Sequence, residues 1–194
     1  MHVSWLNSAS RDSDVRKSRT SNRGLLTSAR RRSGASRTQL RVETLEPRMM
    51  MAGVVINEIL ASSSGQYIVD EDGDDSDYIE LYNSSASTVD LSGWYLTDNA
   101  SQLTKWQIPS MDLDPGEYLV IFASNKNRTD PVGELHTNFA LSADGEYLGL
   151  VQTDGTTIED EYAPEFPEQF TDASFGLADI YVDDVLVGQE LRYF

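Results

Sequence analysis

The chain has 194 residues, a formal net charge of −17 and no cysteine. That length accommodates one domain, or one domain with an appendage. The lack of cysteine excludes a disulfide framework, a cysteine-ligated metal cluster and a cysteine nucleophile. No stretch approaches the roughly 18–20 apolar residues of a membrane-spanning helix, so none is predicted.

The charge is divided unequally along the chain. Residues 1–52 contain eleven Lys or Arg and four Asp or Glu, a balance of +7, whereas residues 53–194 contain four and 28, a balance of −24. The first segment has too few apolar residues to build a core, so we expect a disordered basic arm. The second segment is predicted to form one strongly acidic domain.

Two functional readings compete for the arm, beside that of a plain solvated tail. The triplet Arg30-Arg31-Arg32 with its flanking serines is compatible with binding to nucleic acid. The segment Leu40–Arg48, with the sequence LRVETLEPR, resembles the planctomycete-type LEPR leader that precedes secreted or surface proteins. We favour the leader, which predicts an exported protein located outside the cell or on its surface.

The acidic domain consists of short apolar runs that are rich in β-branched and aromatic residues. Turn signals such as Pro115-Gly116 and Asp144-Gly145 separate them. In chain order the predicted strands lie at Val54–Leu60, Tyr78–Tyr82, Val89–Leu96, Lys105–Ile108, Tyr118–Ala123, Tyr147–Val151, Thr156–Ile158 and Ile180–Val187. No stretch has a helical period with caps, and strands at this spacing favour an all-β sandwich or barrel.

Three features of these runs make sharper predictions. Ile79 and Leu81 should share the buried face of their strand, because side chains alternate along a strand. The run Tyr118–Ala123 is apolar on both faces, which predicts a central strand. Gly93 should mark a bulge or tight bend inside Val89–Leu96, and the tryptophans Trp94 and Trp106 are expected in the core rather than on a binding platform.

A series of longer motifs carries a family resemblance. They are Val55–Ile59, Asp77–Asn83, Val89–Asp98, Lys105–Pro109, Gly116–Ser124, Leu135–Ser142, Gly145–Leu150 and Ser174–Gly176. In this order they resemble the lamin tail domain family, bacterial type. The resemblance implies an immunoglobulin-like β-sandwich over 53–194, preceded by the disordered basic arm 1–52. Bacterial members look like modules of secreted or surface proteins, often beside enzymes or other binding domains.

The chain departs from the family pattern in two places. Family members commonly have Trp where this chain has Tyr78, a substitution that keeps an amphipathic aromatic side chain. A Thr-Pro-Gly-containing stretch usually follows the final strand, whereas this chain stops at Leu191–Phe194 without one. That departure predicts a domain truncated at its C-terminus, or one piece of a longer protein.

The segment from Asp70 to Asp77 is the most pointed candidate site. Seven of its eight residues, DEDGDDSD, carry hydroxyl or carboxylate oxygens, and Ca²⁺ takes six to eight oxygen ligands from flexible loops. The helix-loop-helix calcium pattern fails, because Asp75 occupies its glycine position and Leu81 its glutamate position. A solvated acidic loop is the alternative. The predicted calcium ligands are Asp70, Asp72, Asp74, Asp75 and Asp77.

Other polar residues favour structural roles. Glu80 and Asn83 should satisfy backbone groups at a sheet corner, as buried polar groups usually do, and Asn57 and Glu58 belong to the same recurring motifs. His136 is expected to be a strand-edge histidine beside Asn138, because no nucleophile-elbow motif accompanies it. No catalytic residue, cofactor other than calcium, or nucleic-acid site in the acidic domain is predicted.

The sequence therefore predicts a non-catalytic module of a secreted or cell-surface protein, with a structural or interaction role and a protein or glycan partner. Two alternatives stay open. The chain is a fragment of a larger secreted enzyme whose catalytic domain lies elsewhere, or it is a calcium-stabilised adhesion domain. In-frame coding sequence for a catalytic domain beyond the stop codon would support the first alternative.

Overall fold

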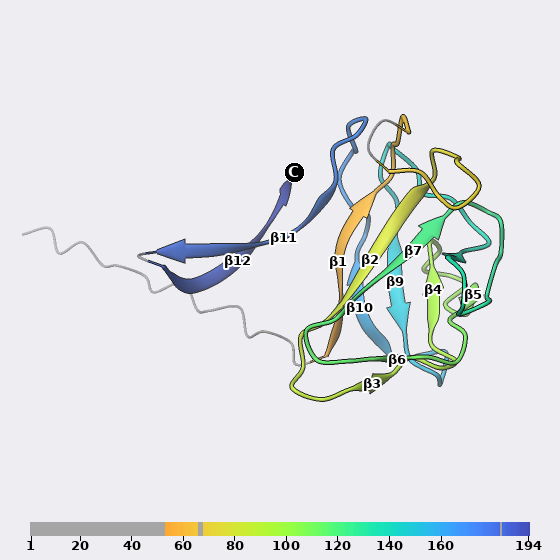
Figure 1. The fold of residues 1–194 in the computed structure, drawn as a ribbon, viewed down its shortest axis with the longest axis horizontal. Coiled ribbons are helices and arrows are strands. Elements are labelled where there is room, and N and C mark those ends of the chain that lie inside the picture. The colour runs from red at the N-terminus through yellow and green to blue at the C-terminus, as the bar shows by residue number, and fades with distance from the viewer. Residues whose placement is uncertain (1–52, 66–67, 183) are drawn as a thin grey trace, which may run out of the picture. The chain divides into compact units, whose positions relative to one another are not determined.

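The computed structural model describes residues 53–194 except 66–67 and 183. Every regular element in this part of the chain is a strand (Figure 1). The strands are β1 (Val54–Leu60), β2 (Asp77–Asn83), β3 (Val89–Asp90), β4 (Tyr95–Thr97), β5 (Trp106–Gln107), β6 (Asp112–Leu113), β7 (Tyr118–Ala123), β8 (Leu135–His136), β9 (Leu148–Val151), β10 (Ile158–Tyr162), β11 (Phe175–Val182) and β12 (Val185–Tyr193). The all-β prediction is confirmed.

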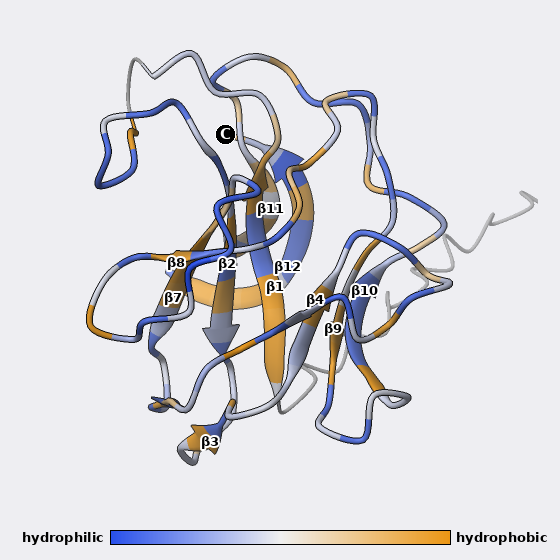
Figure 2. Cartoon of the chain, turned by 90° about the vertical axis from the view of Figure 1, so that its right-hand side faces the viewer, coloured by the Kyte–Doolittle hydropathy of each residue, from blue (hydrophilic) through white to orange (hydrophobic). Residues whose placement is uncertain are grey.

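The strands form two facing sheets and one short ribbon. The larger sheet has the order β12-β11-β1-β2-β7-β8, the smaller has β10-β9-β4-β5, and β3 pairs with β6. All pairs are antiparallel except β7 with β8. The two sheets pack as a sandwich of the immunoglobulin-like type, because one core cluster contains apolar residues from both. Figure 2 shows hydrophobic residues in the strands of each sheet.

The core lies between these faces and draws on both sheets. Ile79 and Leu81 of β2 are fully buried, as the alternation predicts, and they belong to one cluster with Leu96 of β4 and Leu148 and Leu150 of β9. Both tryptophans are in the same cluster, Trp106 being 2% exposed and Trp94 9%. Their predicted core role is confirmed.

The predicted run Val89–Leu96 divides between two elements. The turn at Gly93, where φ is +80°, separates β3 from β4, and the two strands enter different sheets. The expected bend is therefore present. Because each piece is only two or three residues long, tertiary pairing rather than local propensity decides where they go.

The run Tyr118–Ala123 was predicted to be a central strand that is apolar on both faces. This prediction is correct for only the second half of β7. Ile121, Phe122 and Ala123 are buried, whereas Tyr118 is 53% exposed and Val120 42%. The strand does lie between β2 and β8, but β8 is two residues long and pairs only with Ile121 and Phe122. The outward side chains of the first half of β7 therefore stay in contact with solvent.

The last two strands form a hairpin that extends beyond the sandwich (Figure 1). Only Phe175 and Gly176 of β11 pair with β1, whereas β11 and β12 pair along their whole length. Gly176 is required at the junction, because a Cβ there would lie 2.3 Å from the carbonyl oxygen of Asn57. The hairpin predicted around Asp183-Asp184 is confirmed, but it is much longer than Ile180–Val187.

Candidate functional site

The acidic loop between β1 and β2 is organised around one buried carboxylate. Asp70 is 4% exposed. Its Oδ1 accepts the backbone N–H groups of Asp72 and Asp74 at 3.0 and 3.1 Å, and its Oδ2 accepts the Ser76 hydroxyl at 2.6 Å. Gly73 has φ of +82°, which a glycine adopts without strain. The loop is thus a folded turn rather than a loose acidic tail.

A lysine ammonium lies where the acidic side chains converge. Lys126, in the loop after β7, places its Nζ 2.6 Å from Asp70, 2.7 Å from Asp72 and 2.9 Å from Asp74. Arg128 adds bonds of 2.6 Å to Glu71 and to Asp72. Two cations from a segment more than fifty residues away therefore offset part of the negative charge of the loop.

These contacts control protonation inside the loop. Burial opposes ionisation of Asp70, but the hydrogen bonds from Lys126, from Ser76 and from the backbone outweigh it and hold the pKa of Asp70 well below its usual range. Hydrogen bonds from Arg128 and Lys126 likewise lower the pKa of Asp72. The carboxylates are therefore ionised and able to bind a cation over the whole neutral range.

The structure brings together three of the five predicted calcium ligands. Carboxylate oxygens of Asp70, Asp72 and Asp74 lie within 4.8 Å of one another. Asp75 is exposed outside this group. The half-buried Asp77 instead accepts backbone hydrogen bonds from Leu141 and Ser63, and burial, the largest influence, raises its pKa to about 6. Any Ca²⁺ at the three carboxylates would have to displace the Lys126 ammonium, so calcium binding stays a prediction.

His136 borders the acidic loop and is fully buried on the edge strand β8. Its Nδ1 lies 2.8 Å from the hydroxyl oxygen of Ser124, its ring stacks on Phe122, and its Nε2 lies 4.0 Å from Glu71. Burial lowers the pKa of His136, which favours the neutral imidazole. A Ser–His contact is one element of a nucleophile–base pair, but here the ring is closed off from solvent. The strand-edge position is as predicted.

The other polar motif residues have mixed outcomes. Asn83 is fully buried, and its side-chain amide donates to the carbonyls of Ser87 and Leu113 at 2.9 and 2.8 Å, as the corner role predicts. The prediction for Glu80 is wrong, because its carboxylate accepts from the side chain of Asn57 at 2.8 Å rather than from backbone. Asn57 reaches it because a bulge displaces this residue from the β1–β2 register.

The outward face of the larger sheet carries an aromatic pair next to this bulge. Tyr82 of β2 and Tyr118 of β7 are directly opposite in register, and their rings stack with centroids 4.5 Å apart. Tyr118 is more than half exposed. A stacked pair of tyrosines offers a flat apolar face with hydroxyl groups at its rim.

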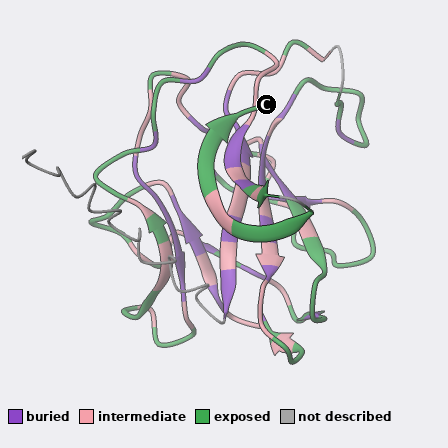
Figure 3. Ribbon diagram, turned by 90° about the vertical axis from the view of Figure 1, so that its left-hand side faces the viewer, coloured by how far each residue is buried: buried purple, intermediate pink, exposed green. Residues whose placement is uncertain are grey.

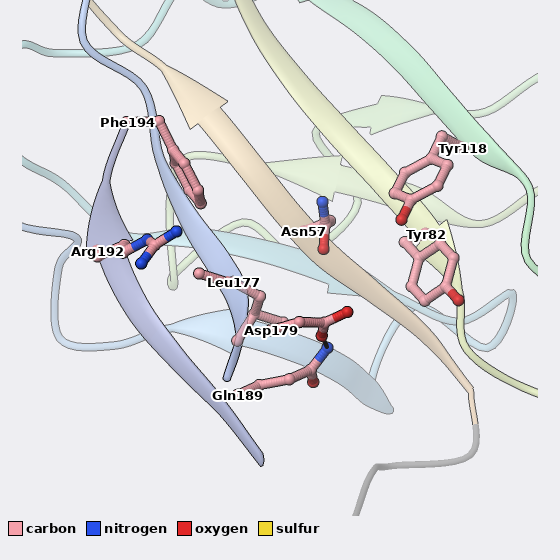
Figure 4. A pocket seen from close by; sticks show the side chains of 9 residues that line it. Asn57, Tyr82, Tyr118, Leu177, Asp179, Gln189, Arg192 and Phe194 are labelled. Atoms are coloured by element: carbon pink, nitrogen blue, oxygen red, sulfur yellow. Dashed lines mark hydrogen bonds between the residues drawn. The ribbon is translucent and has the colours of Figure 1, made fainter. Parts of the chain in front are cut away.

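A groove of about 220 Å³ lies between this face and the hairpin. The sheet side contributes Asn57 and the two tyrosines, and Figure 4 shows the hairpin side chains across from them. The hairpin side contributes Leu177, Ala178, Asp179, Gln189, Arg192 and Phe194. Gln189 donates to Asp179 at 2.8 Å, and Arg192 lies over the Phe194 ring at 5.1 Å, so these groups are already oriented.

Sequence reasoning did not find the groove or the cationic side of the acidic loop. Both depend on residues that are far apart in the chain. One signal was available for the loop: residues 53–194 have only four cationic side chains against 28 acids, a ratio that favours an acidic partner for each cation. All four do, with Lys105 bound to Asp98 and Arg192 to Glu190.

Comparisons with known proteins agree with the fold. No helix in the described residues has the length and apolar character needed to cross a membrane. A search of curated proteins returned no match. The model of the lamin tail domain family matches residues 49–164, a range that covers β1 to β10 and ends before the hairpin. With more than half of its length matched, the chain belongs to the lamin tail domain family.

Proposed function

We propose that this chain is a non-catalytic interaction module of a secreted or cell-surface protein, and that its ligand binds in the groove beside the hairpin. The observation that carries the proposal is the groove's chemistry. Stacked tyrosines lie on one side, and an amide, a carboxylate and a guanidinium lie on the other. A binding site of this kind combines apolar area with a few convergent polar groups.

The ligand class that fits best is a neutral glycan. The exposed Tyr118 ring presents a flat face to the C–H groups of a sugar ring, while Asn57, Gln189 and Asp179 supply donors and acceptors for hydroxyl groups. A polyanion is disfavoured, because residues 53–194 carry a balance of −24.

Binding to an array of neutral oligosaccharides, with anionic ones as a comparison, tests this proposal. Tyr118→Ala should weaken binding to any positive oligosaccharide at least tenfold. Val120→Ala is the matched control, because Val120 is the next outward residue of β7, is 42% exposed and does not line the groove. Absence of binding, or equal binding by both variants, would contradict the glycan assignment.

Export is the second part of the proposal and rests on the LEPR-like segment Leu40–Arg48. This segment and the whole arm 1–52 lie outside the described residues. Mass spectrometry of the protein recovered from its native cells tests the idea. We expect extracellular or surface-associated protein that lacks the arm. Recovery of the intact chain from the cytoplasm would count against it.

A calcium-stabilised adhesion domain is the second candidate, and the convergence of Asp70, Asp72 and Asp74 favours it. Thermal unfolding with Ca²⁺ and then with chelator, at fixed ionic strength, is the test. A ligand at about 100 times its dissociation constant stabilises the folded state by about 2.7 kcal/mol. A rise in midpoint that Mg²⁺ reproduces would indicate charge screening instead.

A further inference from the structure

The hairpin formed by β11 and β12 is supported by the sandwich only at its base. Two register pairs join β11 to β1, whereas eight join β11 to β12. Beyond Gly176 the hairpin is a two-stranded ribbon, and β12 is the last strand of the larger sheet. An isolated two-stranded ribbon is marginally stable in water, and an unpaired edge is a template for another strand.

The ribbon also exposes more apolar side chains than a solvated hairpin needs. Figure 3 shows most of it as exposed. The large apolar residues that are at least 37% exposed are Tyr181, Val182, Val185, Leu186, Val187, Leu191, Tyr193 and Phe194. Within β12 there is one acid, Glu190, and one base, Arg192. Edge strands are usually protected by charge, and this one carries no net charge in a strongly acidic domain.

The backbone of β12 has its free hydrogen-bonding groups at known positions. The N–H of Phe194 donates to the carbonyl of Ser174 on the β11 side. Because the groups alternate along an antiparallel strand, Arg192 and Glu190 face β11, while Tyr193, Leu191 and Gln189 face outward. A register shift leaves Val187 outside the β11–β12 pairing. With respect to the described strands, the regular free edge is therefore 189–193.

This five-residue edge, with the sequence QELRY, is complementary to itself. An antiparallel copy related by a twofold axis through Leu191 places each Glu190 opposite the Arg192 of the other copy, and the two Leu191 side chains meet. An axis through Glu190 or Arg192 would place like charges opposite each other, which is destabilising. An axis through Gln189 would leave Glu190 opposite Gly188, with no partner.

We propose that two copies of this chain associate through β12, in antiparallel register about Leu191, so that the larger sheet continues across the interface. The interface makes two Glu190–Arg192 pairs between copies, whereas within one copy these side chains are 3.9 Å apart and both more than half exposed. An exposed ion pair contributes little to stability. Replacing the pair within one copy by pairs between copies therefore costs little free energy. The dimer covers the apolar side chains near the axis and satisfies the outward backbone groups.

Sedimentation equilibrium of the full chain, from micromolar to submillimolar protein at physiological salt, measures the association. The wild type should dimerise reversibly. Glu190→Arg alone and Arg192→Glu alone should each weaken dimerisation at least about tenfold, since both create like-charge pairs across the axis. Asp112→Arg on β6 makes the same kind of charge change at an exposed site outside the hairpin and should not weaken dimerisation.

Mixing the two single variants distinguishes dimerisation in this register from dimerisation with any other cause. An equimolar mixture of the two single variants should form a heterodimer, because every arginine at the interface then faces a glutamate of the other copy. The double variant that carries both changes should regain wild-type dimerisation. The proposal is overturned by a wild type that stays monomeric at submillimolar concentration, including one that instead binds a different protein at this edge. It is also overturned by single variants that dimerise like the wild type, or by a mixture that stays monomeric.

Discussion

The sandwich and its terminal hairpin are built from the same kind of strand but are stabilised differently. In the sandwich, Ile79, Leu81 and Asn83 of β2 are fully buried, and the residues between them, Glu80 and Tyr82, are half-buried. In β12, every residue is exposed or half-buried. The comparison shows that strand pairing alone does not produce a core, because burial requires a second layer. The two strands of the hairpin are hydrogen-bonded to each other but are not covered by a second layer. Their apolar side chains are therefore available to a partner.

The sharpest way to test this contrast is to remove matched apolar groups. Ile79→Ala deletes a side chain with 0% exposure in β2 and should cost about 3–4 kcal/mol of unfolding free energy through lost burial and a residual cavity. Leu186→Ala in β12, where 42% of the residue is exposed, should cost under about 0.5 kcal/mol. Urea denaturation at low protein concentration measures both, and similar losses would refute the contrast.

The acidic loop is a third kind of region, because charge rather than apolar contact holds it to the sandwich. Lys126→Met should cost about 2 kcal/mol, since Asp70 would remain a buried carboxylate without its ammonium partner. Lys105→Met is the control, because it breaks a partly exposed pair with Asp98 and should cost less than about 1 kcal/mol. Thermal unfolding compares the two variants.

The Lys126 variant also tests the calcium prediction. With the ammonium removed, the carboxylates of Asp70, Asp72 and Asp74 repel one another. Added Ca²⁺ should therefore raise the unfolding midpoint of Lys126→Met more than that of the wild type, and Asp72→Asn in the same background should reduce the rise. Equal responses of variant and wild type would show that the cluster is no cation site.

A smaller effect should appear in the pH dependence. Burial raises the pKa of Asp77 to about 6, above the ordinary 3.8 of an unfolded Asp. Asp77 therefore stays protonated to a higher pH in the folded protein than in the unfolded chain. The stability that this protonation contributes at low pH is lost as the pH rises through about 6. Asp77→Asn should remove a loss on the order of 1 kcal/mol between pH 4 and 7. The exposed Asp112→Asn is the control, because Asp112 is not among the groups that raise the pKa of Asp77. An Asp77→Asn profile identical to that of the wild type would contradict the assignment.

The smallest effect concerns local opening. Backbone amides of the hairpin beyond Gly176 should exchange with solvent through local openings whose free energy barely depends on urea. Backbone amides of β2 and β9 should exchange only on global unfolding. Hydrogen exchange at protein concentrations too low for dimers measures this. If the hairpin amides followed the global unfolding, the ribbon would be part of the cooperative sandwich.

Much of the fold could be predicted because its strands are strong local signals. Val54–Leu60 was predicted with the bounds that β1 has, and the run Tyr78–Tyr82 differs from β2 by one residue at each end. The two-residue strands β6 and β8 were missed, because two residues cannot show an alternation. The predicted Thr156–Ile158 overlaps β10 only at Ile158, since β10 continues through the acidic residues Glu159, Asp160 and Glu161.

Those acids are tolerated in β10 because it is an edge strand with specific partners. Asp160 accepts the backbone N–H of Ile56 at 2.8 Å, close to the bulge in β1, and Glu161 accepts the Tyr147 hydroxyl at 2.8 Å. A pattern based on hydrophobicity cannot anticipate such contacts, since one partner lies in β1 and the other immediately before β9. The same limit applies to Glu80, whose partner Asn57 depends on that bulge.

The sequence by itself determined the fold class, the family and the unequal distribution of charge, because alternation, turn residues and ordered motifs are local properties of the chain. Only the tertiary structure decided that Lys126 and Arg128 pair with the acidic loop, that Tyr82 and Tyr118 form a groove with the hairpin, and that β12 pairs on one side only among the described strands. Each of these depends on residues that are distant in sequence and meet only when the sheets pack. Their charge and exposure are set by that packing.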